Sequence, residues 1–372
     1  MSTPTPITVW QTTTGGAFRD PNITARWLNA LRRNIVMYAF AQNLPKISAF
    51  AQILLKNSDS QPFQPDFIVQ PVYGGLSGPD LQNAQPEWIN ATAGTMSLTD
   101  FSANYMYAKF TPAILGKAVR LNFFEIAVMQ SPNVIIDQLA LKMTEAHLQM
   151  MLAFMNAIMG TRGTDDSRFY GILDIIDNGI NQPNYGQIDR ATYTWWNAPI
   201  YLATSYMADN PPLYQVIKRA IKDYAKTFGN VYGMPGLAVT DYDTWNKIAE
   251  SFTAIEQYVV ANLDQVSDLR SYQVKAINID GIWIIPDAFL STYQKTINNQ
   301  TRTCGRIFFI NLDYIRFTTA SPFEFYVLDW QNEFAGGDST KRLSFATAIL
   351  LGGQFWSDRP RAHFRLDDVV IA

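Results

Sequence analysis

The sequence predicts an α+β fold in which a basic N-terminal arm and a long charge-poor loop precede a long helix, an α/β lobe and a β-rich return. Three observations support this order. Apolar residues recur at helical spacing over residues 131–159, strand-like runs alternate with helical segments between residues 199 and 310, and β-type runs dominate residues 314–370. Because one hydrophobic core stops growing at roughly 250 to 300 residues, a chain of 372 residues predicts two lobes or one elaborated domain.

The composition is low in charge and high in aromatic side chains. With 48% apolar residues and a net charge of -3, the chain does not fit a disordered protein. Charged residues make up 16%, against an average of about 25%. A soluble monomer needs ionic groups on its surface, so we expect much of this surface to be buried against other chains. The most apolar windows, 150–159 and 345–355, are shorter than the roughly 18 to 20 residues of a membrane span, and no secretory signal is visible.

The residues that usually carry catalysis and metal binding are scarce. The chain has one cysteine, Cys304, and two histidines, His147 and His363. A lone cysteine forms no internal disulfide and no thiolate zinc site by itself. We therefore predict no catalytic residue, no metal site and no cofactor, and we do not expect an enzyme.

Carboxylates are the remaining source of chemistry, since glycoside hydrolysis needs only two facing acids. Asp241 is equally well placed to cap the helix that follows it. A carboxylate-dependent glycoside hydrolase with aromatic subsites stays open as an alternative of another class. The candidate acids are Asp165, Asp166, Asp241, Asp243, Glu324, Asp329, Asp367 and Asp368.

The first 56 residues form the basic arm. They carry six basic residues and one acidic residue, a net charge of +5, whereas the rest of the chain sums to -8. Helical spacing of Trp27, Leu31 and Ile35 predicts an amphipathic helix, which Pro45 divides from a second one. The arginines are suited to pair with the acidic body of a neighbouring copy, to contact a polyanion or to face solvent, and the sequence leaves these alternatives open.

The charge-poor loop covers residues 61–115, which hold only five charged residues. Strands are predicted at Asp66 to Tyr73 and at Ala108 to Asn122. Aromatic residues between them, among them Trp88 and Phe101, argue against disorder. We expect a two-stranded arm that projects from the body of the protein and is ordered by packing against another surface.

The long helix is the clearest single element. Ser131 is suited to the N-cap, Pro132 to the first turn and Gly160 to the position after the end. One stripe is apolar and comprises Ile135, Leu139, Met143, Ala146, Met150, Phe154 and Ala157. A second stripe is polar and comprises Gln138, Lys142, Glu145, Gln149 and Asn156.

The remaining segments predict the α/β lobe and the β return. Helices are expected at 199–228 and 241–252, and strands at 236–240, 272–279, 281–285 and 306–310, with a turn at Asp280-Gly281. Further strands are expected at 314–319, 323–330, 341–355 and 361–370, as a meander.

The order of these parts resembles the major capsid proteins of tailed phages, which have the Hong Kong 97-type fold. Several local stretches are similar to that family as well, and together they span most of the chain from about residue 24. They are Ser131-Pro132, Gly171-Ile172-Leu173-Asp174, Gln187-Ile188-Asp189-Arg190, Trp195-Trp196-Asn197, Ile307 to Ile310 with Asn311-Leu312-Asp313, and Arg359-Pro360-Arg361-Ala362.

The resemblance implies a set of domains: an N-terminal arm (1–64), an extended E-loop (65–118), a peripheral domain with the long spine helix (119–200 and 320–372) and an axial domain (201–319). It also implies self-assembly as hexamers and pentamers into an icosahedral shell around double-stranded DNA, in a virion assembled in the host cytoplasm. An encapsulin-like compartment is the alternative within the same fold.

The partners implied are further copies of the chain, a separate scaffolding protein, a portal, a decoration protein and non-specifically contacted DNA, with no membrane. A covalent cross-link from Lys109 or Lys117 to Asn332, as some members form, has little support in the sequence. The expected inter-subunit contacts are Arg19, Arg26, Trp27, Arg32, Arg33, Trp88, Phe101, Tyr105, Tyr107 and Lys109.

Overall fold

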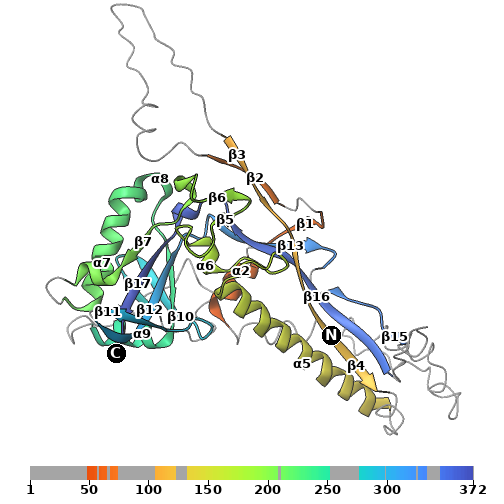
Figure 1. Cartoon of the computed structure of the whole chain (residues 1–372). Helices are drawn as coiled ribbons and strands as arrows, with labels where there is room; N and C mark the ends of the chain where they lie inside the picture. Colours follow the sequence, from red (N-terminus) through yellow and green to blue (C-terminus); the bar gives the residue numbers. More distant parts are fainter. Residues whose placement is uncertain are drawn as a thin grey trace, which may run out of the picture. The chain divides into compact units, whose positions relative to one another are not determined.

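The structure is a computed structural model of the whole chain (Figure 1). It describes residues 48–56, 58–64, 68–73, 105–122, 132–207, 211–251, 276–297, 299–323, 326–332 and 344–371. The described residues fall into two compact units. The first contains Leu115–Ala153 and Phe323–Leu351, and the second contains Pro45–Ile114, Phe154–Pro322 and Gly352–Ala372.

The first unit contains the long helix up to Ala153 and strands that pair with one long strand. The helix α5 spans Pro132–Met159, the bounds predicted from its flanking proline and glycine. Met143, Ala146 and Met150 are buried, whereas Glu145 and Gln149 are exposed, which confirms the predicted stripes at these positions. The strand β16 (Ser344–Ser357) pairs with β4 (Ala113–Asn122), β14 (Tyr326–Val327) and β15 (Gln331–Asn332).

The second unit is centred on a mixed seven-stranded sheet in the order β7, β17, β12, β8, β10 and β9, with β11 paired to β12. Two pairs are parallel, β17 with β7 and β10 with β8, and the other pairs are antiparallel. All four residues of β8 are buried, as expected for a strand covered on both faces. The strands are β7 (Ile200–Leu202), β8 (Leu237–Thr240), β9 (Ile277–Ile279), β10 (Ile282–Pro286), β11 (Tyr293–Ile297), β12 (Gln300–Ile310) and β17 (Phe364–Val370).

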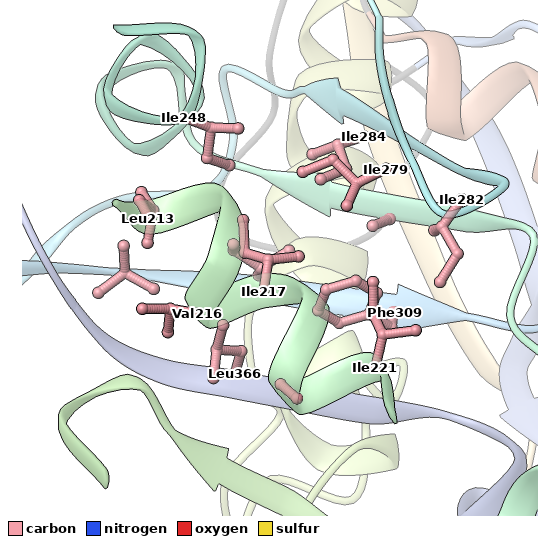
Figure 2. Packing of buried hydrophobic residues seen from close by; sticks show 14 of the residues in the cluster. Leu213, Val216, Ile217, Ile221, Ile248, Ile279, Ile282, Ile284, Phe309 and Leu366 are labelled. Atoms are coloured by element: carbon pink, nitrogen blue, oxygen red, sulfur yellow. The ribbon is translucent and has the colours of Figure 1, made fainter. Parts of the chain in front are cut away.

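Two helices of this unit, α7 (Leu213–Tyr224) and α9 (Tyr242–Ser251), pack against that sheet. Val216, Ile217 and Ile221 of α7 are buried, at the i, i+1, i+5 positions of one apolar stripe. Figure 2 shows them directed at strand residues that include Ile284 and Phe309. The sheet and α7 therefore share one hydrophobic core. Shorter helical segments are η3 (Ala203–Tyr206), η4 (Ala225–Gly229) and α8 (Asn230–Tyr232).

The rest of the second unit surrounds the second half of β16. There β16 is antiparallel to β13 (Ile315–Ser321), which is parallel to β1 (Asp59–Pro62). Phe50 of α2 (Ala49–Lys56) is fully buried and meets Phe355 edge to face, with ring centroids 6.5 Å apart. The other elements are β2 (Ile68–Tyr73), β3 (Tyr105–Phe110), α6 (Ile172–Ile175), β5 (Asn184–Tyr185), β6 (Ile188–Asp189), η2 (Thr194–Trp196) and η7 (Pro360–Ala362).

Four expectations about the secondary structure and its arrangement were wrong. The strand predicted over 108–122 is two strands, β3 and β4, separated at Thr111 and Pro112, because proline has no N–H to continue a ladder. The helix predicted over 199–228 begins only at Leu213, since residues 200–202 pair with β17 instead. Of the run 323–330, the described part holds only the two-residue β14. The final strands do not form one meander, because β17 joins the other sheet between β7 and β12.

Candidate assembly surfaces

The hairpin of β2 and β3 has one buried face and one exposed apolar face. Pairing in register places Ile68 opposite Phe110 and Val72 opposite Met106 on the first face, where Ile68, Val72 and Phe110 are buried. On the other face Tyr107 is 61% exposed and lies opposite Pro71. Alternation along a strand sends neighbouring side chains to opposite faces, so Val69, Pro71 and Tyr107 share the outward face and are exposed there.

Phe110 anchors the buried face of this hairpin. Its ring lies 5.8 Å from that of Tyr170, 5.2 Å from that of Tyr185 and 5.6 Å from that of Trp356. The first two contacts are edge to face, the arrangement that aromatic quadrupoles favour. The side-chain amide of Gln354 donates to the Thr111 carbonyl at 2.7 Å, just beyond the end of β3. The root of the hairpin is thus held by both rings and hydrogen bonds.

A second hairpin, β5 with β6, presses its turn against β3. Gly186 and Gln187 both have positive φ, 59° and 63°, as a tight hairpin turn requires. The Gly186 carbonyl accepts the backbone N–H of Lys109 at 2.9 Å. A Cβ at Gly186 would lie 2.9 Å from Phe110 Cζ, so this position needs glycine for its approach as well as for its φ.

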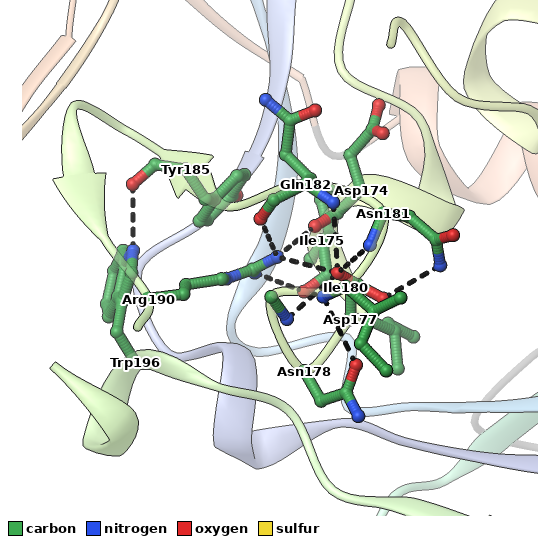
Figure 3. A network of polar contacts seen from close by, with 12 residues as sticks. Asp174, Ile175, Asp177, Asn178, Ile180, Asn181, Gln182, Tyr185, Arg190 and Trp196 are labelled. Atoms are coloured by element: carbon green, nitrogen blue, oxygen red, sulfur yellow. Dashed lines mark hydrogen bonds and ion pairs between the residues drawn. The ribbon is translucent and has the colours of Figure 1, made fainter. Parts of the chain in front are cut away.

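A buried arginine organises the loop between α6 and that hairpin (Figure 3). The Arg190 guanidinium donates to the carbonyls of Asp174 at 2.7 Å, Ile175 at 2.8 Å and Gln182 at 3.3 Å. The first two are carbonyls at the end of α6, which have no partner within the helix. The carboxylate of Asp177 lies 3.9 Å from the guanidinium. Burial lowers the pKa of Arg190 to about 10, so the side chain stays protonated at neutral pH.

A recess opens beside the β2–β3 hairpin, with a volume of about 420 Å³. The Arg361 guanidinium donates to the Thr194 carbonyl at 2.8 Å, and Arg359 lies over the ring of Tyr314 at 4.9 Å. These contacts fix two cations at an aromatic rim. The lining residues are Gln70, Pro71, Val72, Trp195, Trp196, Tyr232, Asp358, Arg359, Pro360 and Arg361.

The helix α5 adds an exposed apolar row in the first unit. Leu141, Leu148 and Leu152 are spaced seven and four residues apart, which places them on one face of the helix. Leu141 is 62% exposed. This row was not predicted from the sequence because the predicted polar stripe surrounds it.

The chain resembles solved capsid structures over most of its length. It matches the capsid asymmetric unit of cyanophage A-1(L) with a TM-score of 0.55 and 11% sequence identity, covering 88% of this chain and 94% of that chain.

The chain has the Hong Kong 97-type capsid fold.

Two further structures similar to this capsid fold have lower scores. The capsid of a native GTA particle matches with a TM-score of 0.48 and 10% identity, over 85% of this chain and 89% of that chain. The holo-SrpI encapsulin complex from Synechococcus elongatus PCC 7942 matches with a TM-score of 0.43 and 10% identity, over 89% and 91%. No protein-family model and no curated protein matches the sequence.

The structure describes three of the ten residues that were predicted as inter-subunit contacts. Tyr107 is exposed, and Lys109 beside it is half-buried. Tyr105 lies in β3, opposite Tyr73. The other predicted contacts, at positions 19, 26, 27, 32, 33, 88 and 101, lie outside the described residues.

Five of the eight acids considered for glycoside chemistry have structural partners: Asp165, Asp166, Asp241, Asp367 and Asp368. Asp241 caps α9, accepting the backbone N–H and the hydroxyl of Thr244 at 2.8 and 2.7 Å. Asp165 accepts from Ser167, and Asp166 pairs with Arg162. Glu324 lies outside the described residues.

Asp367 and Asp368 also have partners. Asp367 pairs with Arg365 at 2.8 Å, and Asp368 accepts the Tyr293 hydroxyl at 2.7 Å. In the described ranges, no three His, Cys, Asp or Glu side chains gather as metal ligands would. Nor does any described helix combine the length and apolarity that a membrane crossing requires.

Proposed function

We propose that this chain is a major capsid protein that assembles as hexamers and pentamers into an icosahedral shell around the double-stranded DNA of a tailed phage. The observation that carries the proposal is the match to a phage capsid subunit that covers nearly the full length of both chains. The low charge and the aromatic content support it, because both suit a chain whose surface is covered by copies of itself.

The proposal assigns the arm to residues 1–64, the E-loop to 65–118, the peripheral domain to 119–200 and 320–372, and the axial domain to 201–319. The exposed face of the β2–β3 hairpin supports the E-loop assignment. Its outward Val69, Pro71 and Tyr107 form an apolar strip on a firmly anchored base, which suits burial against a neighbouring subunit. The basic arm then faces DNA or a neighbour, and a scaffolding, portal or decoration protein joins during assembly in the host cytoplasm.

Assembly is the property to measure. Purified protein should form capsomers or large particles in negative-stain images and in sedimentation velocity. A monodisperse monomer at every protein and salt concentration would overturn the proposal. Deleting residues 80–105 should leave the folded body intact, as judged by circular dichroism, and should impair assembly. If the deletion variant forms normal particles, the E-loop assignment is wrong.

The content of the particles separates a virion from an encapsulin-like compartment. Particles produced with the phage packaging machinery should protect double-stranded DNA from nuclease, whereas a compartment would hold protein cargo. Removing residues 1–33 should weaken salt-sensitive DNA retention, because phosphate contacts by arginine release counterions. Unchanged retention would assign the arm to subunit contacts.

A further inference from the structure

The loop that follows α6 has an unusual surface composition. Residues 178–187 contain no charged residue, and Ile180 at their centre is 79% exposed. No other large apolar side chain in the described part of the chain is more exposed. The other exposed side chains of these residues are all uncharged, four of them amides and one a proline: Asn178, Asn181, Pro183, Asn184 and Gln187.

The backbone of this loop is held in one shape by a buried carboxylate. Asp177 accepts the backbone N–H groups of Gly179 at 2.9 Å, Asn181 at 3.0 Å and Gln182 at 3.0 Å, and also the side-chain amide of Asn181. Arg190 holds the Gln182 carbonyl from the inner side (Figure 3). Ile180 is therefore presented on a preorganised loop, which lowers the entropy lost when it is buried by a partner.

The combination of an apolar centre and an uncharged amide rim specifies the kind of partner. Charge is depleted at the core of protein interfaces. A surface that meets its own copy about a twofold axis must be complementary to itself. Amides meet this condition because each has donors and an acceptor, whereas a charged rim would bring like charges together.

We propose that the loop of residues 177–187 is a like-with-like contact, in which Ile180 of one copy meets Ile180 of another about a twofold axis of the shell. This inference rests on the proposed shell function and adds to it a specific pairing surface. It commits to a second copy of this chain as the partner.

Cross-linking tests whether the two loops meet. Ile180→Cys is made together with Cys304→Ser, which removes the only native thiol, and assembled particles are treated with a short bis-maleimide. Covalent dimers should form on a reducing gel. The control is Gln294→Cys in the same background, an exposed site on β11, which should give no dimer above that of the dissociated protein. Particles that form without dimers from the Ile180→Cys variant would overturn the inference.

Charge substitution tests the symmetry of the contact. Ile180→Asp and Ile180→Lys should each fold with an unchanged melting temperature, since the side chain is exposed, and each should reduce particle yield at least tenfold. A one-to-one mixture should regain particles that contain both variants, because opposite charges then meet. No recovery in the mixture would place Ile180 against a different surface, and normal assembly of either variant alone would also overturn the inference. If the wild-type chain forms no particles, the proposed function itself fails.

Discussion

Replacing Phe110 by alanine should lower the stability of the fold, whereas replacing Tyr107 should affect only assembly. The two side chains lie three residues apart in β3, on opposite faces. Phe110 is 1% exposed and contacts three rings, so Phe110→Ala creates a cavity at a cost of about 3 to 5 kcal/mol in the free energy of unfolding. Tyr107→Ala removes a mostly exposed ring and should change that free energy by less than about 0.5 kcal/mol.

The expected shift in melting temperature follows from the size of the chain. An unfolding entropy of about 2.1 cal/mol/K per residue gives roughly 0.8 kcal/mol/K for 372 residues, so the loss at Phe110 corresponds to about 4 to 6 °C. Differential scanning calorimetry of unassembled subunits measures it, and sedimentation of both variants measures assembly. Equal melting temperatures for the two variants would refute the assignment of the faces. Wild-type particle yield from Tyr107→Ala would refute the assembly role of the outward face.

Three further predictions concern the second unit. Arg190→Met should destabilise the fold by about 3 to 5 kcal/mol in urea unfolding, because it leaves the Asp177 carboxylate buried without its cation, and a loss below 1 kcal/mol would contradict this. Burial lowers the pKa of His363 to about 3, so the unfolded state binds one more proton between about pH 6.5 and that value. Stability should therefore fall by about 1.4 kcal/mol per pH unit on acidification in this window. His363→Gln should remove that contribution, and an unchanged pH profile would be inconsistent with it. Gly353→Ala should cost about 1 to 3 kcal/mol in thermal unfolding, since its Cβ would clash with the Thr318 carbonyl of β13. The control Gly236→Ala has open space around it and should be near neutral; equal effects would count against the contact.

The elements that the sequence predicted well are those bounded by proline, glycine or a capping residue. Pro132 and Gly160 bound α5 as expected. The turn at Asp280-Gly281, with φ of 52° and 86°, joins β9 to β10 as expected. Asp241 caps α9. In each case the deciding interaction lies within a few residues of the position, so periodicity and capping rules capture it.

The candidate surfaces depended on contacts that the sequence does not encode locally. Ile180 and the three leucines of α5 were not singled out, because an isolated apolar residue carries no signal of its exposure. Arg190 belonged to a stretch resembling the capsid family, yet its role as a donor to three carbonyls came only from the structure. The strand at residues 200–202 was predicted as helix, since its partner β17 lies more than 160 residues away.

The sequence by itself determined the order of the parts, the length of α5 and the unusual shortage of charge. These are properties of residue type and short-range spacing, and the capsid fold was predicted from the resemblance of the order of parts and of local stretches to a known family. Only the tertiary structure decided that β17 leaves the final strands to join the other sheet, that Phe110 points inward while Tyr107 points outward, and that Ile180 stands exposed on a fixed loop. The first two depend on pairings between residues distant in the chain, and the third depends on how Asp177 and Arg190 hold one loop backbone, so each selects one arrangement among several that local preferences allow.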